Sequence, residues 1–144
     1  MAASPNGKVF MKHSNYLIIL FLTGLILSCQ SPKQSEDISE GHRLVSPKEM
    51  KELKAMDEVQ FIDVRTVKEF REEHIKGAQN LVYDTDFKDK IQQLDKSQPV
   101  AVYCRTGRRS HECAKMLHEA GFNKIYELKG GITKWKHEDF STVE

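Results

Sequence analysis

Short apolar runs alternate with amphipathic segments along most of the chain. Several of the runs are rich in β-branched and aromatic residues, which favours strands over helices. The pattern predicts buried strands at 59–64 and 99–104, further strands at 78–83 and 125–128, and a weak first strand at 43–45. Uninterrupted apolar strands are typical of a parallel sheet that is covered on both faces. The pattern therefore predicts an α/β domain with a mainly parallel sheet.

Helices are predicted between these strands, and two of them begin with the same signal. Ser46 with Glu49, and Thr66 with Glu69, have the spacing of a capping box, in which a hydroxyl and a carboxylate satisfy the first backbone N–H groups of a helix. Apolar side chains at helical spacing predict further helices over 87–94, over 108–120, and around Ile132 and Trp135. A helix thus follows nearly every strand, as parallel connections require.

A different pattern lies near the start of the chain. Residues 16–27 are almost continuously apolar, follow Lys8 and Lys12, and are fewer than the about 20 residues that a membrane-spanning helix needs. This arrangement is typical of a signal peptide. The sequence I-L-S-C at 26–29 resembles the bacterial lipobox, although Leu27 stands where that motif prefers a smaller residue, and it predicts lipidation of Cys29. A plain membrane anchor or an uncleaved signal is the alternative.

These patterns divide the chain into four predicted segments. Residues 1–28 are a signal peptide, in which 1–10 could be a spurious extension because Met11 and Lys12 form a normal signal start. Residues 29–41 hold the lipidated cysteine and a disordered tether that is poor in apolar residues. Residues 42–138 form one domain, and 139–144 a polar tail that should fray. The expected location is a membrane-anchored lipoprotein facing the periplasm or the cell exterior.

Composition narrows the range of functions. The 144 residues suit one ordinary domain, and 22 basic residues nearly balance 21 acidic ones. This balance gives no basis for nucleic-acid binding, so recognition by charge must be local. With Cys29 assigned to the lipid, Cys104 and Cys113 are too few for a disulfide framework. Free thiols in an exported protein suggest a chemical role for at least one of them.

Cys104 stands at the end of a predicted strand and is followed by a basic loop. Gly107 allows a positive φ that can curl backbone N–H groups toward the sulfur, and the next helix contributes its unpaired N–H groups. These groups, with Arg105, Arg108 and Arg109, should lower the pKa of Cys104 and make it a nucleophilic thiolate. Arg105 is the first choice for contacting an anionic substrate. A small buried hydrophobe is the less favoured interpretation of this cysteine.

Other polar residues near this loop have two interpretations each. Ser110 could donate its hydroxyl to the sulfur or cap the helix, and neither option is favoured. Cys113 is expected to pack in the core, with a resolving thiol as the alternative. His74 is expected to make loop hydrogen bonds and His111 to be exposed, while a catalytic base is the less favoured role for either.

Four segments together resemble one family. The stretch V-Y-C-R-T-G-R-R-S at 102–110 resembles the active-site loop of rhodanese-like sulfurtransferases. The family's other signatures are similar to I-D-V-R-T-V-K-E-F at 62–70, H-I-K-G-A-Q-N-L at 74–81 and L-K-G-G-I-T-K-W at 128–135. Lys76 stands where the family usually has proline. The resemblance extends over about 43–137 in the family's order.

The resemblance implies a fold and a reaction. The fold would be a single parallel sheet of about five strands, flanked by helices on both faces, with Cys104 at the carboxyl edge. The Cys104 thiolate would accept sulfur from thiosulfate or a persulfide donor and pass it to cyanide, a small thiol or a protein thiol. Neither a cofactor nor a metal is implied. The substrate-binding residues would be Arg105, Thr106, Gly107, Arg108, Arg109 and Ser110, with structural support from Asp63 and Arg65.

Three other functions are compatible with parts of this sequence. The domain could be a binding module without activity, because fold does not establish catalysis. It could instead be a periplasmic carrier that exchanges persulfides or thiols with a partner. A cysteine phosphatase or arsenate reductase is more remote, since such loops need an arginine six positions after the nucleophile, where this chain has Ser110.

Overall fold

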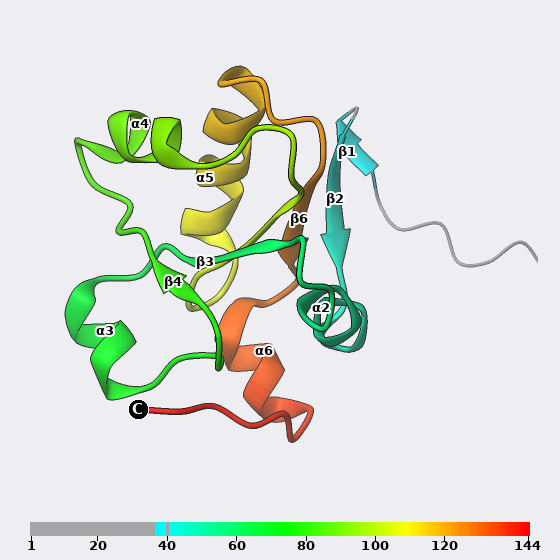
Figure 1. Cartoon of the computed structure of the whole chain (residues 1–144). Helices are drawn as coiled ribbons and strands as arrows, with labels where there is room; N and C mark the ends of the chain where they lie inside the picture. Colours follow the sequence, from blue (N-terminus) through cyan, green and yellow to red (C-terminus); the bar gives the residue numbers. More distant parts are fainter. Residues whose placement is uncertain (1–36, 40) are drawn as a thin grey trace, which may run out of the picture. The chain divides into compact units, whose positions relative to one another are not determined.

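One six-stranded sheet organises the part of the chain described by the computed structural model, residues 37–39 and 41–144. Neighbouring strands follow the order β1-β2-β6-β5-β3-β4. All pairs are parallel except that of β1 with β2, which is antiparallel. The strands are β1 (Asp37–Ser39), β2 (His42–Val45), β3 (Gln60–Asp63), β4 (Gln79–Asn80), β5 (Val100–Tyr103) and β6 (Ile125–Leu128) (Figure 1).

Short helices connect the strands, and two begin at the capping boxes predicted from the sequence. The reciprocal hydrogen bonds of Ser46 with Glu49, and of Thr66 with Glu69, are both present. None of the helices in the described residues is long and apolar enough to cross a membrane. The helices are α2 (Pro47–Lys54), α3 (Val67–Glu72), α4 (Phe87–Lys90) with the 3-10 turn η1 (Ile91–Gln93), α5 (Arg108–Glu119) and α6 (Gly131–His137).

Two apolar clusters cover the opposite faces of the sheet. Alternate residues of β5 contribute to each, because successive side chains of a strand point to opposite faces. One cluster contains Val100 and Val102 and packs against side chains of α4, η1 and α5. The other contains Ala101 and Tyr103 and packs against side chains of α2 and α6. The predicted fold class, a parallel sheet of about five strands flanked by helices on both faces, is confirmed for β2 to β6, and β1 adds a sixth, antiparallel strand at the edge.

Two segments are more ordered than the sequence analysis expected. β1 falls within the stretch assigned to the tether, yet it pairs antiparallel with β2 at the edge of the sheet. Main-chain hydrogen bonds make this pairing, so the low apolar content of the stretch does not prevent it. Instead of fraying, the C-terminal residues run back beside α3 (Figure 1), where Val143 and His74 exchange backbone hydrogen bonds of 2.8 and 2.7 Å.

Other predicted elements differ in length or lie outside the described residues. The strand predicted over 78–83 is reduced to the two residues of β4, and the helix predicted over 87–94 divides into α4 and η1. The predicted signal peptide, Cys29 and most of the tether are not among the described residues.

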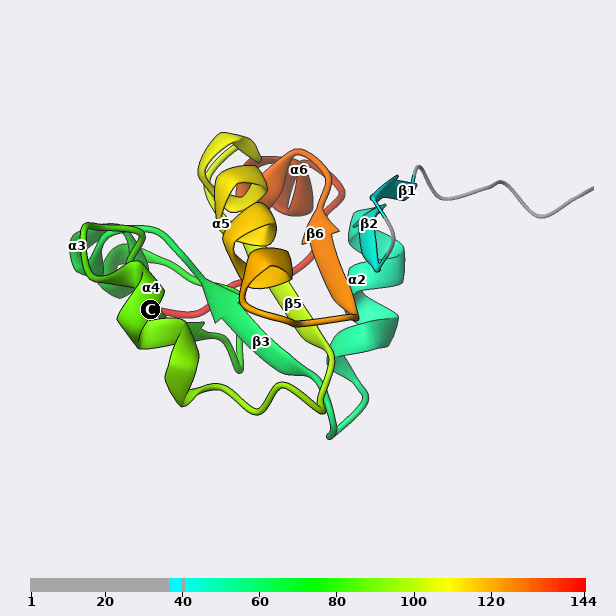
Figure 2. The same ribbon diagram turned by 90° about the horizontal axis from the view of Figure 1, so that it is seen from above.

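The order of the strands determines where chemistry can occur. β5 lies between β3 and β6 in the interior of the sheet, and all three run in the same direction. Figure 2 shows these strands side by side. The loops that follow them therefore meet at one edge of the sheet, which is where open α/β folds bind ligands. Cys104 directly follows β5 at this edge.

Candidate active site

The sulfur of Cys104 is enclosed by the loop that leads from β5 into α5. The residue is 1% exposed. The backbone N–H of Gly107 donates a hydrogen bond to Sγ at 3.1 Å, and Ser110 Oγ lies 3.6 Å from the same atom. Gly107 precedes the first residue of α5 with φ of 110°, a left-handed conformation that L side chains rarely adopt. The predicted curl of the loop around the sulfur is therefore present in the structure.

These contacts control the charge of the thiol. Burial by itself raises the pKa of Cys104, because it disfavours the thiolate. Hydrogen bonds from the N–H and hydroxyl of Ser110, and from the N–H groups of Gly107 and Thr106, oppose that effect and are stronger in sum. The resulting pKa of Cys104 is below the ordinary value of a cysteine. A thiolate can thus form at this position without a histidine base.

The start of α6 holds the cysteine loop from the opposite side. The backbone N–H of Ile132 donates to the carbonyl of Cys104 at 2.9 Å, and that of Thr133 to the carbonyl of Arg105 at 3.1 Å. Gly131 permits this approach, because a Cβ atom there would overlap both carbonyl oxygens. The glycine pair in the segment L-K-G-G therefore fits the helix against the loop.

The three arginines of the loop occupy different environments. Arg109 donates two hydrogen bonds of 2.8 Å to the carboxylate of Glu69 on α3. The Nε atom of Arg105 lies 3.4 Å from the same carboxylate, but its side chain is 65% exposed. Arg108 is exposed. Of the three arginines, Arg105 is therefore the one that both contacts Glu69 and keeps most of its side chain exposed to solvent.

Glu69 is a residue whose second role the sequence analysis missed. Its carboxylate completes the capping box of α3 and also accepts both hydrogen bonds from Arg109. The pairing with Arg109 is the main reason why the pKa of Glu69 falls from 4.5 to about 2. The capping-box pattern explains the local hydrogen bonds, but the contact joins residues 40 positions apart and has no local sequence signal.

Asp63 and Arg65 form a buried ion pair next to this edge of the sheet. The guanidinium Nε of Arg65 donates to both carboxylate oxygens of Asp63, at 3.0 and 2.9 Å, and Nη2 donates to one of them at 2.7 Å. Nη2 also donates to the carbonyl of Glu73 at 2.5 Å. The pair thus connects the end of β3 to the end of α3. These are structural contacts, and neither side chain hydrogen-bonds to the sulfur of Cys104.

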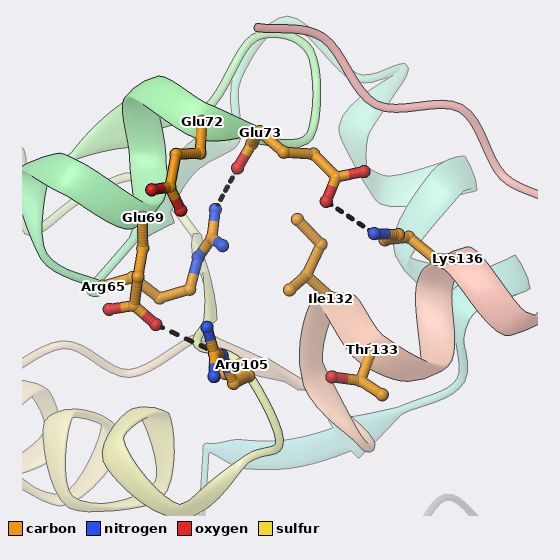
Figure 3. Close-up of a pocket in the computed structure, with 8 residues that line it drawn as sticks. All are labelled: Arg65, Glu69, Glu72, Glu73, Arg105, Ile132, Thr133 and Lys136. Carbon is orange, nitrogen blue, oxygen red and sulfur yellow. Dashed lines mark hydrogen bonds and ion pairs between the residues drawn. The ribbon is translucent and has the colours of Figure 1, made fainter.

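A charged pocket of about 350 Å³ opens beside the cysteine loop, between α3 and α6 (Figure 3). Arg105 projects from the loop into this group of residues, and Lys136 pairs with Glu73 at 2.6 Å. Cys104 is not among the lining residues, so the pocket adjoins the loop without reaching the sulfur. The lining residues are Arg65, Glu69, Glu72, Glu73, Arg105, Ile132, Thr133 and Lys136.

The hydroxyl of Ser110 has partners beyond the sulfur. Gly107 is the N-cap residue of α5, so Ser110 does not occupy the capping position. Its Oγ lies 2.9 Å from the carbonyl of Gly107 and 3.0 Å from Oε1 of Glu127 on β6. Glu127 is 2% exposed. The sequence analysis missed this carboxylate, because a single glutamate in an apolar strand carries no spacing signal.

The other residues considered as a second thiol or a catalytic base are Cys113, His74 and His111, and none of them hydrogen-bonds to the sulfur of Cys104. Cys113 is fully buried in the same apolar cluster as Cys104, and burial raises its pKa, so it stays a protonated thiol. His74 forms a hydrogen bond of 2.9 Å between Nδ1 and the carbonyl of Phe70, whose ring stacks on it. His111 lies near Glu127, 3.2 Å from its Oε2 atom.

The sequence of the domain matches a known protein family. Residues 46–138 match the family model described as rhodanese-like domain. The chain belongs to the rhodanese-like family. The matched region contains the cysteine loop, both partners of the Asp63–Arg65 pair and the glycine pair before α6.

Curated relatives of this rhodanese-like chain differ in length and in name. Over 95 residues it is 35% identical to the thiosulfate sulfurtransferase GlpE of Coxiella burnetii, covering 66% of this chain and 88% of GlpE. It is 36% identical over 103 residues to the tRNA uridine(34) hydroxylase of Acinetobacter baylyi, but the match covers 68% of this chain and only 32% of that protein. It is 40% identical over 76 residues to the uncharacterised protein YqhL of Bacillus subtilis, covering 53% of this chain and 60% of YqhL. One of these relatives is thus named a sulfurtransferase and another a hydroxylase, so the names do not share one activity.

Solved structures agree on the fold of the rhodanese-like domain. A rhodanese-related protein from Thermoplasma volcanium matches with a TM-score of 0.62 and 26% identity, covering 70% of this chain and 97% of that one. A rhodanese-like domain from Anabaena matches with a TM-score of 0.63 and 27% identity, covering 69% of this chain and 77% of that one.

Proposed function

We propose that the chain is a sulfurtransferase in which Cys104 carries sulfur as a persulfide between a small anionic donor, such as thiosulfate, and a thiol or cyanide acceptor. The observation that carries this proposal is the loop that encloses one buried sulfur: the Gly107 N–H donates to Sγ at 3.1 Å, Ser110 Oγ lies 3.6 Å away, and the N–H groups of Thr106 and Ser110 also favour the thiolate. Such a loop stabilises a negative charge on sulfur, as an oxyanion hole does on oxygen. The similarity to GlpE, named a thiosulfate sulfurtransferase, supports the same donor.

The first half-reaction forms the persulfide. The Cys104 thiolate attacks the outer sulfur of thiosulfate, and a new S–S bond forms at Sγ. The bond between the outer sulfur and the sulfonate breaks, and sulfite leaves with its electron pair. In this proposal Arg105, which is exposed and next to the nucleophile, attracts the dianion and balances the charge of the departing sulfite.

The second half-reaction returns the enzyme to its starting state. An acceptor thiolate or cyanide attacks the outer sulfur of the persulfide, and the S–S bond breaks with its electron pair returning to Sγ. The cysteine leaves as a thiolate, which is the form that the loop N–H groups stabilise. Neither step consumes a proton at Sγ, so a ring of fixed donors suffices.

The pairing of Arg109 favours sulfur chemistry over phosphate chemistry. A cysteine phosphatase grips phosphate with a free bidentate arginine in the loop. Both terminal nitrogens of Arg109 are instead hydrogen-bonded to Glu69 at 2.8 Å. The arginine that could bind a phosphate group is therefore already occupied.

Sulfur loading of the folded protein tests this proposal. The reduced chain is incubated with thiosulfate, desalted and weighed intact by mass spectrometry. We expect the mass of one added sulfur atom, removed by cyanide or by a reductant. Cys104→Ser should abolish the adduct, and Cys113→Ser, the matched change at the other buried cysteine, should keep it. A folded, reduced protein that takes up no sulfur would instead favour the binding-module alternative.

We further propose that the domain is exported and held at a membrane by a lipid on Cys29. The support is the signal-peptide pattern of residues 16–29 and the polar stretch that follows it. A tethered domain of this kind would meet small sulfur anions or protein thiols outside the cytoplasm.

A further inference from the structure

Ser110 connects the cysteine loop to a second cluster of reactive side chains. The side chains of His42 on β2, His111 on α5 and Glu127 on β6 lie next to one another. Glu127 Oε2 lies 3.1 Å from His42 Nε2 and 3.2 Å from His111 Nδ1. One ligand atom from each residue lies within 4.8 Å of the other two. Within the described part of the chain, no other three histidine, cysteine or acidic side chains bring their ligand atoms this close together.

The fold places these three residues without a flexible loop. In the parallel pair of β2 and β6, His42 aligns with Ile125 and Leu44 with Glu127. His42 and Glu127 therefore point to the same face of the sheet, two positions apart in register. That face is covered by α5, which contributes His111 from its first turns. Three separate elements thus converge on one spot.

The side chain of Glu127 is buried among polar partners, and a bound cation would stabilise its carboxylate. Within the described residues, its hydrogen-bonding side chains are the hydroxyl of Ser110 and the two imidazoles. Both His42 and Glu127 are 2% exposed. Burying a carboxylate costs several kcal/mol unless a cation compensates it. Its neighbour across Ser110 is Cys104, whose thiolate would add a second negative charge. A cation at the shared oxygen would offset both.

We propose that His42, His111 and Glu127 bind a divalent transition-metal ion of the zinc type. Two imidazole nitrogens and one carboxylate oxygen form a donor set that zinc accepts, with a fourth position left for water or another ligand. Ligand atoms around a tetrahedral zinc ion lie roughly 3.3 to 3.5 Å from one another, given bonds of about 2.0 to 2.2 Å. The two N···O separations, 3.1 and 3.2 Å, are close to that spacing, and the two imidazole nitrogens lie within 4.8 Å of each other.

The surroundings fit such an ion in two further respects. Oε1 of Glu127 lies 3.0 Å from Ser110 Oγ, and the other oxygen, Oε2, faces both imidazoles. A polar contact beside a ligating carboxylate helps to orient it. The side chain of His111 is 35% exposed, so the ion can enter from solvent.

The proposed metal site is separate from the proposed sulfur transfer. Cys104 is not one of the three ligands, and the sulfur reaction uses no metal. Through Ser110, the ion would nonetheless reduce the negative charge that faces the thiolate. Metal binding and sulfur loading can therefore be measured independently, and either proposal can fail without the other.

Cobalt titration tests the metal site, because tetrahedral Co²⁺ occupies zinc sites and absorbs visible light. We expect visible bands that saturate at one ion per full-length chain and disappear when Zn²⁺ displaces the cobalt. His111→Ala and His42→Ala should each weaken binding by about tenfold or more. His118→Ala removes an exposed histidine of the same helix and should leave the affinity unchanged.

One control variant and one fallback variant complete the cobalt experiment. Cys104→Ala should retain the bands, since a thiolate ligand at the proposed site is not expected. His111 is partly exposed, so His111→Ala decides the matter if His42→Ala does not fold. The proposal is overturned by the absence of saturable bands, by undiminished affinity in His111→Ala, or by loss of the bands in Cys104→Ala.

Discussion

The proposed sulfur chemistry depends on Cys104, and its neighbours counteract the effect of burial on the pKa of its thiol. Enclosure of Cys104 alone would favour the neutral thiol. N–H groups of three following residues reverse that preference, which is possible because Gly107 turns the chain with a positive φ. The guanidinium groups differ in what they can add, since Arg109 is bound to Glu69 and Arg105 is exposed.

Arg105→Ala tests the residue assigned to the anionic donor. We expect kcat/KM for thiosulfate to fall about two- to fivefold, because one exposed charge contributes up to about 1 kcal/mol. The free energy of unfolding should change little, since the side chain is 65% exposed. Arg108→Ala removes an equal charge from an exposed position in the same loop and should have a smaller effect. Equal losses of stability and activity in Arg105→Ala would contradict the assignment.

At the scale of elements, two helices other than α5 hold the cysteine loop in place. α3 does so through Glu69 and Arg109, and α6 through the N–H groups of Ile132 and Thr133. Both contacts come from residues distant in sequence from Cys104. The loop is therefore a product of the packed fold as much as of its own sequence.

Glu69→Ala should loosen the contact between α3 and α5. At neutral pH we expect a loss of about 1–2 kcal/mol in the free energy of unfolding, from the cap and the charged hydrogen bonds together. The pKa of Glu69 is lowered from 4.5 to about 2, so its contribution is complete above about pH 5 and is lost as the pH falls toward 2.

Urea unfolding of the wild type and of Glu69→Ala at several pH values measures the contribution of Glu69 to the free energy of unfolding. The difference between the two proteins should shrink as the pH is lowered through that window. Glu72→Ala, a change in the same helix at an exposed residue that pairs only distantly with Lys68 at 3.9 Å, should cost much less at every pH. A difference that stays constant from pH 7 to pH 2 would exclude the ion pair as its source.

Gly131→Ala tests the close approach of α6 to the loop. The new Cβ would overlap the carbonyl oxygens of Cys104 and Arg105, so we expect a loss of about 3 kcal/mol or more and impaired sulfur loading. Gly121→Ala is the matched control, because Gly121 also has a positive φ but no atom within 4 Å of the added Cβ. It should cost only about 1 kcal/mol. Similar losses at both positions, read from thermal or urea unfolding, would show that the close approach is unimportant.

At the scale of the whole molecule, the sequence predicts local structure better than contacts between elements. The capping boxes of Ser46 and Thr66 identify two helix starts correctly, and the apolar run before Cys104 identifies the central strand. Hydrogen bonds within a few residues leave such signals. Glu127 and the pairing of Glu69 with Arg109 depend on strand order and helix packing, which no local pattern records. The ordered C-terminal residues escape prediction for the same reason, since backbone bonds between Val143 and His74 hold them.

The proposed membrane anchor is also a property of the whole chain. We expect the protein in the membrane fraction of cells, and we expect Cys29→Ala to release it or to leave the signal peptide uncleaved. Cys113→Ser, which changes a buried cysteine of the domain, should not alter the location. A wild-type protein found entirely in the soluble fraction would contradict lipidation.

The charge of Cys104 at neutral pH is the property on which the proposed sulfur transfer depends. The rate of alkylation of Cys104 by iodoacetamide, followed by peptide mass spectrometry as a function of pH, measures it directly. The rate should reach half its maximum below about pH 8.5, the pKa of an unperturbed thiol, because the loop N–H groups stabilise the thiolate. A midpoint at or above that value, or a sulfur that does not react in the folded protein, would show that the loop does not hold an accessible anion.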